Sequence, residues 1–227
     1  MNKAQADIRT IAFTKMTTTP ALSLPGDCQQ RIAHLLGRGQ RQILGIAAAP
    51  GAGKSTLAQA ISAQFGAAVQ VVPMDGFHLA NSELERLGRR ARKGAPDTFD
   101  AAGYVNLLRR IQKQAPDEVV YAPVFRREIE EAVAGAIAVQ PDTPLIVTEG
   151  NYLLLDDAPW CEVRVVADEI WYLDVPDELR QARLLSRHMQ FGHSRDAALA
   201  WIANTDEPNA VRIAQGRWRA DLQVACA

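Results

Sequence analysis

Several features of secreted, metal-binding or membrane proteins are scarce in this sequence. There are only three cysteines, Cys28, Cys161 and Cys226, and they form no C-x-x-C pair. This pattern favours packing roles in a reducing compartment over disulfides or a zinc site. No apolar run approaches the length of a membrane span, and residues 1–24 lack the apolar core of a secretion signal. We therefore expect a cytoplasmic protein that does not insert into membranes.

An excess of charge of either sign is also missing. Lys and Arg total 25 against 26 Asp and Glu, so the formal net charge is −1. Proteins that bind nucleic acids usually show a basic excess or a basic stripe, so the composition argues against a nucleic-acid partner. A small-molecule partner fits this composition, and a homodimer stays open.

Short apolar runs alternate with amphipathic segments along the chain, which is typical of a parallel-sheet α/β domain. Residues 1–24 show no sustained periodicity and are expected to form a loosely ordered extension, with Met16 as an alternative start, before a domain at 25–227. Segment 80–100 is expected to be a basic loop, and 119–125 with 132–139 a strand-rich excursion. Buried strands are expected at 42–48, 68–73, 145–147, 170–175 and 222–225, and helices at 27–36, 55–65, 100–111, 176–189 and 194–202.

The segment 48–56, A-A-P-G-A-G-K-S-T, matches the phosphate-loop pattern G-x-x-x-x-G-K-S/T except that Ala48 replaces the first glycine. It lies between an expected strand and an expected helix, as phosphate binding by a helix N-terminus requires. The alternative is an ordinary Gly-rich turn, and Ala48 requires a negative φ. Lys54 would supply a mobile cation and Ser55 a Mg²⁺ ligand. The residues assigned to nucleotide binding are Ala49, Pro50, Gly51, Ala52, Gly53, Lys54, Ser55 and Thr56.

A phosphate loop does not distinguish kinases from other nucleotide-binding proteins. The guanine-reading pattern Asn-Lys-x-Asp is absent, since Asn2-Lys3 lacks the Asp. Residues 100–103, D-A-A-G, match a GTPase switch pattern, but Asp100 at a helix start is better explained as a cap. Asp75 follows the strand after the phosphate-loop helix, at the sheet end where ligands of open α/β folds bind.

Four motifs carry a family resemblance over roughly residues 40–225. They are the phosphate loop, M-D-G-F-H at 74–78, R-K-G-A-P-D-T-F-D at 92–100 and E-G-N-Y-L-L-L at 149–155, with an Arg-rich helix behind them. Together they resemble the small-molecule kinases that group uridine kinase, phosphoribulokinase and bacterial type I pantothenate kinase. The strings E-G-N-Y-L-L-L-D at 149–156 and D-E-P-N-A at 206–210 are similar to a bacterial group named as fructose-transport-system kinases.

The resemblance implies a P-loop NTPase-type fold with three α/β/α layers, a mainly parallel five-stranded central sheet, and a small strand-rich insertion and lid. It also implies transfer of the γ-phosphate of MgATP to a hydroxyl of a sugar, nucleoside or pantothenate-like metabolite. Two alternatives stay open: a non-catalytic nucleotide-binding regulator tied to a transport system, and a simple ATPase. The carboxylate of Asp75 argues against a regulator, which needs no base.

Asp75 matches the position at which the family places its proposed general base, although Asp-Gly is also a turn dipeptide. Glu149 follows an apolar strand, where many phosphate-loop proteins hold the Mg²⁺ water shell with a carboxylate. We assign Glu149 to Mg²⁺ or to the acceptor, and it is the alternative base. Asn151 and Tyr152 follow immediately and are expected to face the acceptor, although Tyr152 is equally suited to aromatic packing.

Two more groups of residues complete the expected site. His78 and Arg92 are assigned to the acceptor, with a solvated turn as the alternative for Arg92. Arg180, Arg183 and Arg187 are three and four residues apart, so they share one helical face. The family resemblance implies that this helix leads into a lid in which an arginine stabilises charge on the transferred group; we assign that role first to Arg187 and then to Arg183. The alternative is a solvated basic face.

Overall fold

The structure, a computed structural model, describes residues 24–225. Met16 and residues 1–23 of the expected extension lie outside the described residues, as do residues 226–227. Leu24 is buried in the core beside helix α1 (Gly26–Leu36). In the part of the chain that is described, no helix is long and apolar enough to cross a membrane.

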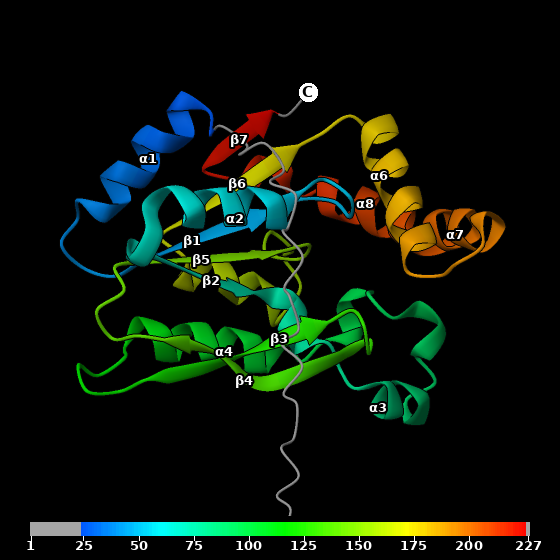
Figure 1. Ribbon diagram of the computed structural model, residues 1–227, viewed down its shortest axis with the longest axis horizontal. Coiled ribbons are helices and arrows are strands. Elements are labelled where there is room, and N and C mark those ends of the chain that lie inside the picture. Colours follow the sequence, from blue (N-terminus) through cyan, green and yellow to red (C-terminus); the bar gives the residue numbers. More distant parts are fainter. Residues whose placement is uncertain (1–23, 226–227) are drawn as a thin grey trace, which may run out of the picture.

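Five parallel strands form the central sheet, as the sequence predicts. They pair in the order β2-β5-β1-β6-β7, and Figure 1 shows them stacked in that order from bottom to top. Strands β1 and β5 are buried along their whole length because helices cover both faces of the sheet. The bounds are β1 Gln42–Ala47, β2 Val69–Pro73, β5 Leu145–Gly150, β6 Glu169–Asp174 and β7 Leu222–Ala225.

Helices on both sides of this sheet complete the three expected layers. Successive residues of β1 point to opposite faces, so Leu44 packs in a core with α1 and α2, whereas Ile43 packs in a core with α4, α5 and α8. The bounds of these helices are α2 Lys54–Phe65, α4 Ala101–Gln112, α5 Val163–Val166 and α8 Glu207–Ala214.

Two helix starts predicted from capping residues are confirmed. The Asp100 carboxylate accepts a hydrogen bond of 2.8 Å from the Gly103 amide at the start of α4, so residues 100–103 form a cap. Ser194 accepts a hydrogen bond from the Ala197 amide at the start of α7 (Arg195–Trp201).

The strand-rich excursion is an antiparallel hairpin of β3 (Val120–Arg126) and β4 (Glu131–Val139). The basic segment before it contains one short helix, α3 (Asn81–Arg86), which the sequence did not predict. The long helix α6 (Asp177–Gln190) leads into α7 as expected. In Figure 1 the hairpin and α3 lie beyond the β2 edge of the sheet, and α6 and α7 lie beyond its strand arrowheads.

The sequence also missed α8 and the π-helical turn Ile202–Asp206 that leads into it. Pro208 lies in the first turn of α8, where proline is tolerated because its missing N–H leaves no helical hydrogen bond unmade. This turn brings Asp206 to the end of α6, beside His188.

Candidate active site

The phosphate loop (residues 48–56) joins β1 to α2 at the point where the sheet order changes direction. Strand β1 lies between β5 and β6, so the loop after β1 opens into the crevice where ligands of open α/β sheets bind. Gly51 and Gly53 have φ of 80° and 94°, and a Cβ on Gly51 would lie 2.5 Å from the Arg180 carbonyl oxygen. Glycine is therefore required at Gly51 by both conformation and space.

Ala48 is compatible with the loop. The described non-glycine residue with a positive φ is Glu130, so the alanine at the first motif position is not in the left-handed region. Its side chain is fully buried in the core beneath α2. The departure from the glycine pattern is accommodated without backbone strain.

Lys54 is buried at the first turn of α2, where backbone N–H groups and the helix dipole favour an anion. Its Nζ donates hydrogen bonds to Asn151 Oδ1 at 2.6 Å and to the Ala49 carbonyl at 3.3 Å. Burial lowers the pKa of Lys54, although the carboxylates of Glu149 and Asp75 oppose that shift. The ammonium is thus held by neutral acceptors at the mouth of an anion-binding helix.

Ser55 and Glu149 form the next part of the site. The Ser55 hydroxyl donates a hydrogen bond of 2.8 Å to Glu149 Oε1, whereas Thr56 lies on the exposed side of α2. Burial raises the pKa of Glu149, and the nearby Asp75 carboxylate raises it further. A hydroxyl and a carboxylate beside a phosphate loop are hard oxygen ligands, so this pair fits Mg²⁺.

Asp75 lies in the turn that follows β2, and the hairpin packs directly on that turn. A Cβ on Gly76 would lie 2.4 Å from the Pro123 carbonyl oxygen in β3. This close approach brings Arg127, just beyond β3, to Asp75, with 3.4 Å between Arg127 Nη2 and Asp75 Oδ2. Arg127 is a site residue that the sequence analysis missed, because an arginine in a hairpin turn carries no motif signal.

A cleft of about 600 Å³, here called the main cleft, lies between the phosphate loop, the β2 end, the hairpin tip and α6–α7. The structure brings several of the sequence-assigned residues together there. Those that line it are Pro50, Gly51, Lys54, Ser55, Asp75, His78, Asn151 and Arg187.

His78 lines this cleft between two phenylalanine rings. Its ring centroid lies 4.0 Å from that of Phe99 and 4.6 Å from that of Phe125. The Nδ1 atom is buried without a hydrogen-bond partner, and burial lowers the pKa of His78 to about 4. The imidazole is therefore neutral at physiological pH.

Two sequence assignments are corrected by the structure. Tyr152 is fully buried, packs against Phe99 and Trp160, and donates its hydroxyl to the Gly94 carbonyl, so it is a core residue and does not face an acceptor. Arg92 is exposed and does not line the main cleft. Both Nη atoms of its guanidinium donate hydrogen bonds to the Asp97 carboxylate, which hold it at the surface. The alternative of aromatic packing therefore holds for Tyr152, and the alternative of a solvated turn holds for Arg92.

The arginine face of α6 points at the phosphate loop. Arg180 is 2% exposed, and its guanidinium donates to the Pro50 carbonyl at 3.1 Å and to Glu207 Oε1 at 2.8 Å. Arg183 is exposed and donates to the Ala52 carbonyl at 3.3 Å. The alternative of a solvated basic face is therefore wrong for Arg180.

Arg187 lies farther along the same face and reaches the main cleft. Burial lowers its pKa, and the charge of Arg127 lowers it further, so the two guanidinium groups act on the same space. The next residue along α6 is His188, whose Nε2 lies 3.0 Å from Asp206 Oδ2 at the end of the π-helical turn. The segment 206–210 noted in the sequence thus supplies partners to both ends of α6.

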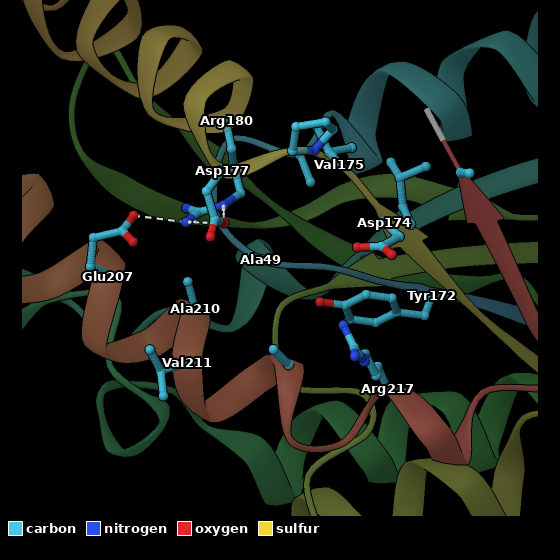
Figure 2. A pocket seen from close by; sticks show the side chains of 15 residues that line it. Ala49, Tyr172, Asp174, Val175, Asp177, Arg180, Glu207, Ala210, Val211 and Arg217 are labelled. Atoms are coloured by element: carbon cyan, nitrogen blue, oxygen red, sulfur yellow. Dashed lines mark hydrogen bonds and ion pairs between the residues drawn. The ribbon is translucent and has the colours of Figure 1, made fainter. Parts of the chain in front are cut away.

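A second space of about 600 Å³, here called the side cavity, lies across the phosphate loop from Asp75. Figure 2 shows Arg180 between Asp177 and Glu207 at one end and Tyr172, Asp174 and Arg217 at the other. Ala49 and Ala52 of the loop belong to its wall. The sequence analysis did not identify this cavity, because its lining comes from the ends of β6 and β7 and from the unpredicted α8.

This chain is similar to known proteins in both sequence and structure. A family model described as "Phosphoribulokinase / Uridine kinase family" matches residues 43–225. A Schizosaccharomyces pombe protein named "Putative uridine kinase" is 38% identical over 182 residues, covering 76% of this chain and 77% of the relative. The Escherichia coli protein YggC is 36% identical over 190 residues, covering 82% and 78%.

A solved structure extends this result to three dimensions. A protein from Silicibacter sp., described as a "putative fructose transport system kinase", is 41% identical and superposes with a TM-score of 0.78. The match covers 87% of this chain and 97% of that structure. It agrees with the resemblance drawn from residues 149–156 and 206–210.

Proposed function

Because this chain belongs to the phosphoribulokinase / uridine kinase family, we propose that it transfers the γ-phosphoryl group of MgATP to a hydroxyl group of a small metabolite. The observation that carries this proposal is the meeting of a phosphate-binding set and a carboxylate in one cleft. Lys54 and Ser55 lie on the phosphate-loop side of the main cleft, and Asp75 lies on the hairpin side. A hydroxyl compound bound between them would face the terminal phosphate.

The phosphate loop supports the binding of the triphosphate. Positive φ at Gly51 and Gly53 turns backbone N–H groups inward, and the start of α2 adds a partial positive charge. Lys54 can leave the neutral oxygen of Asn151 for a phosphate oxygen at little cost, since both accept the same ammonium group. The side cavity, on the other side of the loop, has the volume for the nucleobase.

Ser55 and Glu149 would hold Mg²⁺, which neutralises phosphate charge when bound. The raised pKa of the buried Glu149 carboxyl means that the ligand-free protein bears an unfavourable negative charge there. A cation at Glu149 relieves that cost, which favours a metal role for this residue over a role as base.

Asp75 is the proposed general base. It lines the main cleft, whereas Glu149 is bonded to Ser55. As the acceptor oxygen forms its bond to the γ-phosphorus, the bond from that phosphorus to the β-γ bridging oxygen breaks, and the hydroxyl proton passes to Asp75. The cleft also contains Arg187, whose charge would stabilise the phosphoryl group in transfer, and Arg183 lies near the loop in a supporting position.

A coupled ADP-release screen tests the proposal. MgATP would be combined in turn with sugars, nucleosides, phosphorylated sugars and pantothenate-like acids, with a Lys54→Met variant as the inactive control. ADP release that needs an acceptor supports the kinase. Equal release without any acceptor would indicate a simple ATPase, and nucleotide binding without release would indicate a regulator.

A further inference from the structure

The hairpin tip is fixed in place by hydrogen bonds from Lys93 and Asn81, and Lys93 and Glu130 also line the main cleft. Lys93 Nζ donates to Asn81 Oδ1 at 2.7 Å and also to the Glu130 carbonyl oxygen. Asn81 Nδ2 donates to the same carbonyl at 3.2 Å, and Glu130 has a positive φ of 54°. Lys93 is only 7% exposed, so its ammonium group is satisfied by these protein acceptors more than by solvent.

Arg127 is held by this fixed tip but is itself loosely bound. Its contact with Asp75 spans 3.4 Å, longer than the 2.7–2.9 Å usual for a charged pair. In the described part of the chain, Asp75 is its one ion-pair partner, although a guanidinium carries five N–H donors. Its side chain is 40% exposed and lines the main cleft.

A second loosely held arginine faces the same space. Arg90 lines the main cleft, and its guanidinium lies 3.9 Å from Glu85, a contact between two exposed side chains. The charge of Arg127 also acts throughout the cleft. It adds to burial in lowering the pKa of Arg187 and of Lys54. Arg90 and Arg127 therefore present guanidinium groups with few ion-pair contacts to the main cleft, whose lining also includes Glu128 and Glu130.

We infer that the acceptor is an anion, with a carboxylate or phosphate group apart from its reacting hydroxyl, and that Arg127 binds this group. The inference rests on the proposed kinase function. It follows from geometry: the fork of a guanidinium matches the two oxygens of a carboxylate or phosphate, and these are better partners than one distant Asp75 oxygen. When Arg127 turns to the acceptor anion, Asp75 loses its cationic partner and can accept the hydroxyl proton. A neutral acceptor leaves Arg127 on Asp75.

Matched probe pairs that differ in charge test the anion site without knowledge of the natural acceptor. The protein would be saturated with Mg·ADP to fill the phosphate loop, and its melting temperature measured with glycerate or glycerol 3-phosphate against glycerol, and with pantothenate against pantothenyl alcohol. Anionic members should raise the melting temperature and neutral members should not, because only a ligand that binds the folded state stabilises it. The carboxylate and phosphate arms show which anion is preferred.

Arg127→Met should abolish the anion-dependent shift, and Arg126→Met is the matched control. Arg126 precedes it on β3, is exposed, and pairs in register with Glu131 across the hairpin, so its variant should keep the shift. Equal shifts with charged and neutral probes, no shift with any probe, or a shift that persists in Arg127→Met would each overturn the inference.

Kinetics separate this inference from the proposed function. For the acceptor pair that supports ADP release, the anionic member should have a kcat/KM about 30- to 100-fold higher, and Arg127→Met should remove most of that advantage. Arg126→Met should keep the kcat/KM of both members within about threefold of the wild type, and an unchanged far-UV circular dichroism spectrum of Arg127→Met checks that this variant remains folded. An anion-dependent shift without acceptor-dependent ADP release would contradict the kinase and leave the anion site standing. Release with equal efficiency for both members would contradict the anion site alone.

Discussion

The Ser55 hydroxyl and the Glu149 carboxylate lie 2.8 Å apart and join the first turn of α2 to the carboxyl end of β5. The parallel pairing of β1 with β5 produces this contact, since Ala47 and Gly150 are partners in register. The residue types and the strand adjacency thus act together to place a hydroxyl and a carboxylate side by side next to the phosphate loop, where we propose that Mg²⁺ binds.

Replacing Glu149 by Gln should raise the stability of the ligand-free protein and weaken its Mg²⁺-dependent nucleotide binding. The raised pKa of Glu149 means that its ionised form is less favourable in the folded than in the unfolded protein at neutral pH. Glu149→Gln keeps an acceptor for Ser55 and removes that cost, so the ligand-free melting temperature should rise, by about 2–4 °C per kcal/mol gained. Mg²⁺-dependent tightening of nucleotide binding should fall at least about tenfold. A lower melting temperature with normal Mg²⁺ dependence would show a purely structural role.

Replacing Lys54 by Met should abolish nucleotide binding. The variant removes the one cation that the loop can direct at the β and γ phosphates, while the methionine retains most of the buried stem. Thermal shift with MgATP measures the effect, and Lys113→Met, at the exposed end of α4, is the control. Unchanged shift and turnover in the Lys54 variant would contradict the assignment of the phosphate loop.

The stability of the protein should decrease as the pH falls through the range set by His78. Its folded pKa of about 4 lies below the ordinary 6.5, so the unfolded chain binds a proton that the folded chain rejects. The stabilising contribution is complete above about pH 6.5 and is lost toward pH 4. Between pH 7 and pH 5, this single group should account for a loss of about 2 kcal/mol.

Urea unfolding of the wild type and of His78→Phe at both pH values measures this contribution. Phenylalanine suits the space between Phe99 and Phe125 and cannot titrate. The wild type should therefore lose more stability than the variant on acidification. Parallel losses in the two proteins would show that carboxylates alone set the pH dependence.

The buried guanidinium of Arg180 should depend on Glu207 far more than on Asp177. Glu207 is 29% exposed at its side chain and Asp177 is 74% exposed, although both contact the same Arg180 nitrogen. Glu207→Gln should lower the free energy of unfolding by about 2–3 kcal/mol and weaken nucleotide binding, because Arg180 also supports Pro50 of the phosphate loop. Asp177→Asn, tested by the same chemical denaturation, should cost less than about 1 kcal/mol. Equal losses would show that burial does not determine the strength of this pair.

Much of the fold was predictable because its signals are local. The phosphate loop, the apolar strands and the caps at Asp100 and Ser194 depend on residues close in sequence, and the structure confirms those elements. The arrangement of Lys54, Asp75 and Glu149 followed from one further rule, that parallel strands place their carboxyl ends at one edge of a sheet.

The missed features depend on contacts between distant parts of the chain. Arg127 reaches Asp75 only because β3 packs on Gly76, and no sequence pattern near Arg127 predicts that contact. Asn151 and Tyr152 both follow the end of β5. The Tyr152 ring packs in the aromatic core, whereas the Asn151 side chain faces Lys54. Residue type could not separate these two outcomes, since tertiary packing decided them.

The rate of acceptor-dependent ADP release in Asp75→Asn tests the central claim most directly. With the acceptor that gives the fastest release in the wild type, kcat should fall by about 10²- to 10⁴-fold, the range for loss of a positioned base. The dissociation constant for MgATP should stay within about threefold, and Asp156→Asn, an exposed carboxylate paired with Arg219, should leave both values unchanged. A kcat within about threefold of the wild type, or a loss of Mg²⁺-dependent nucleotide binding with no separate effect on transfer, would contradict the role of Asp75 as the base.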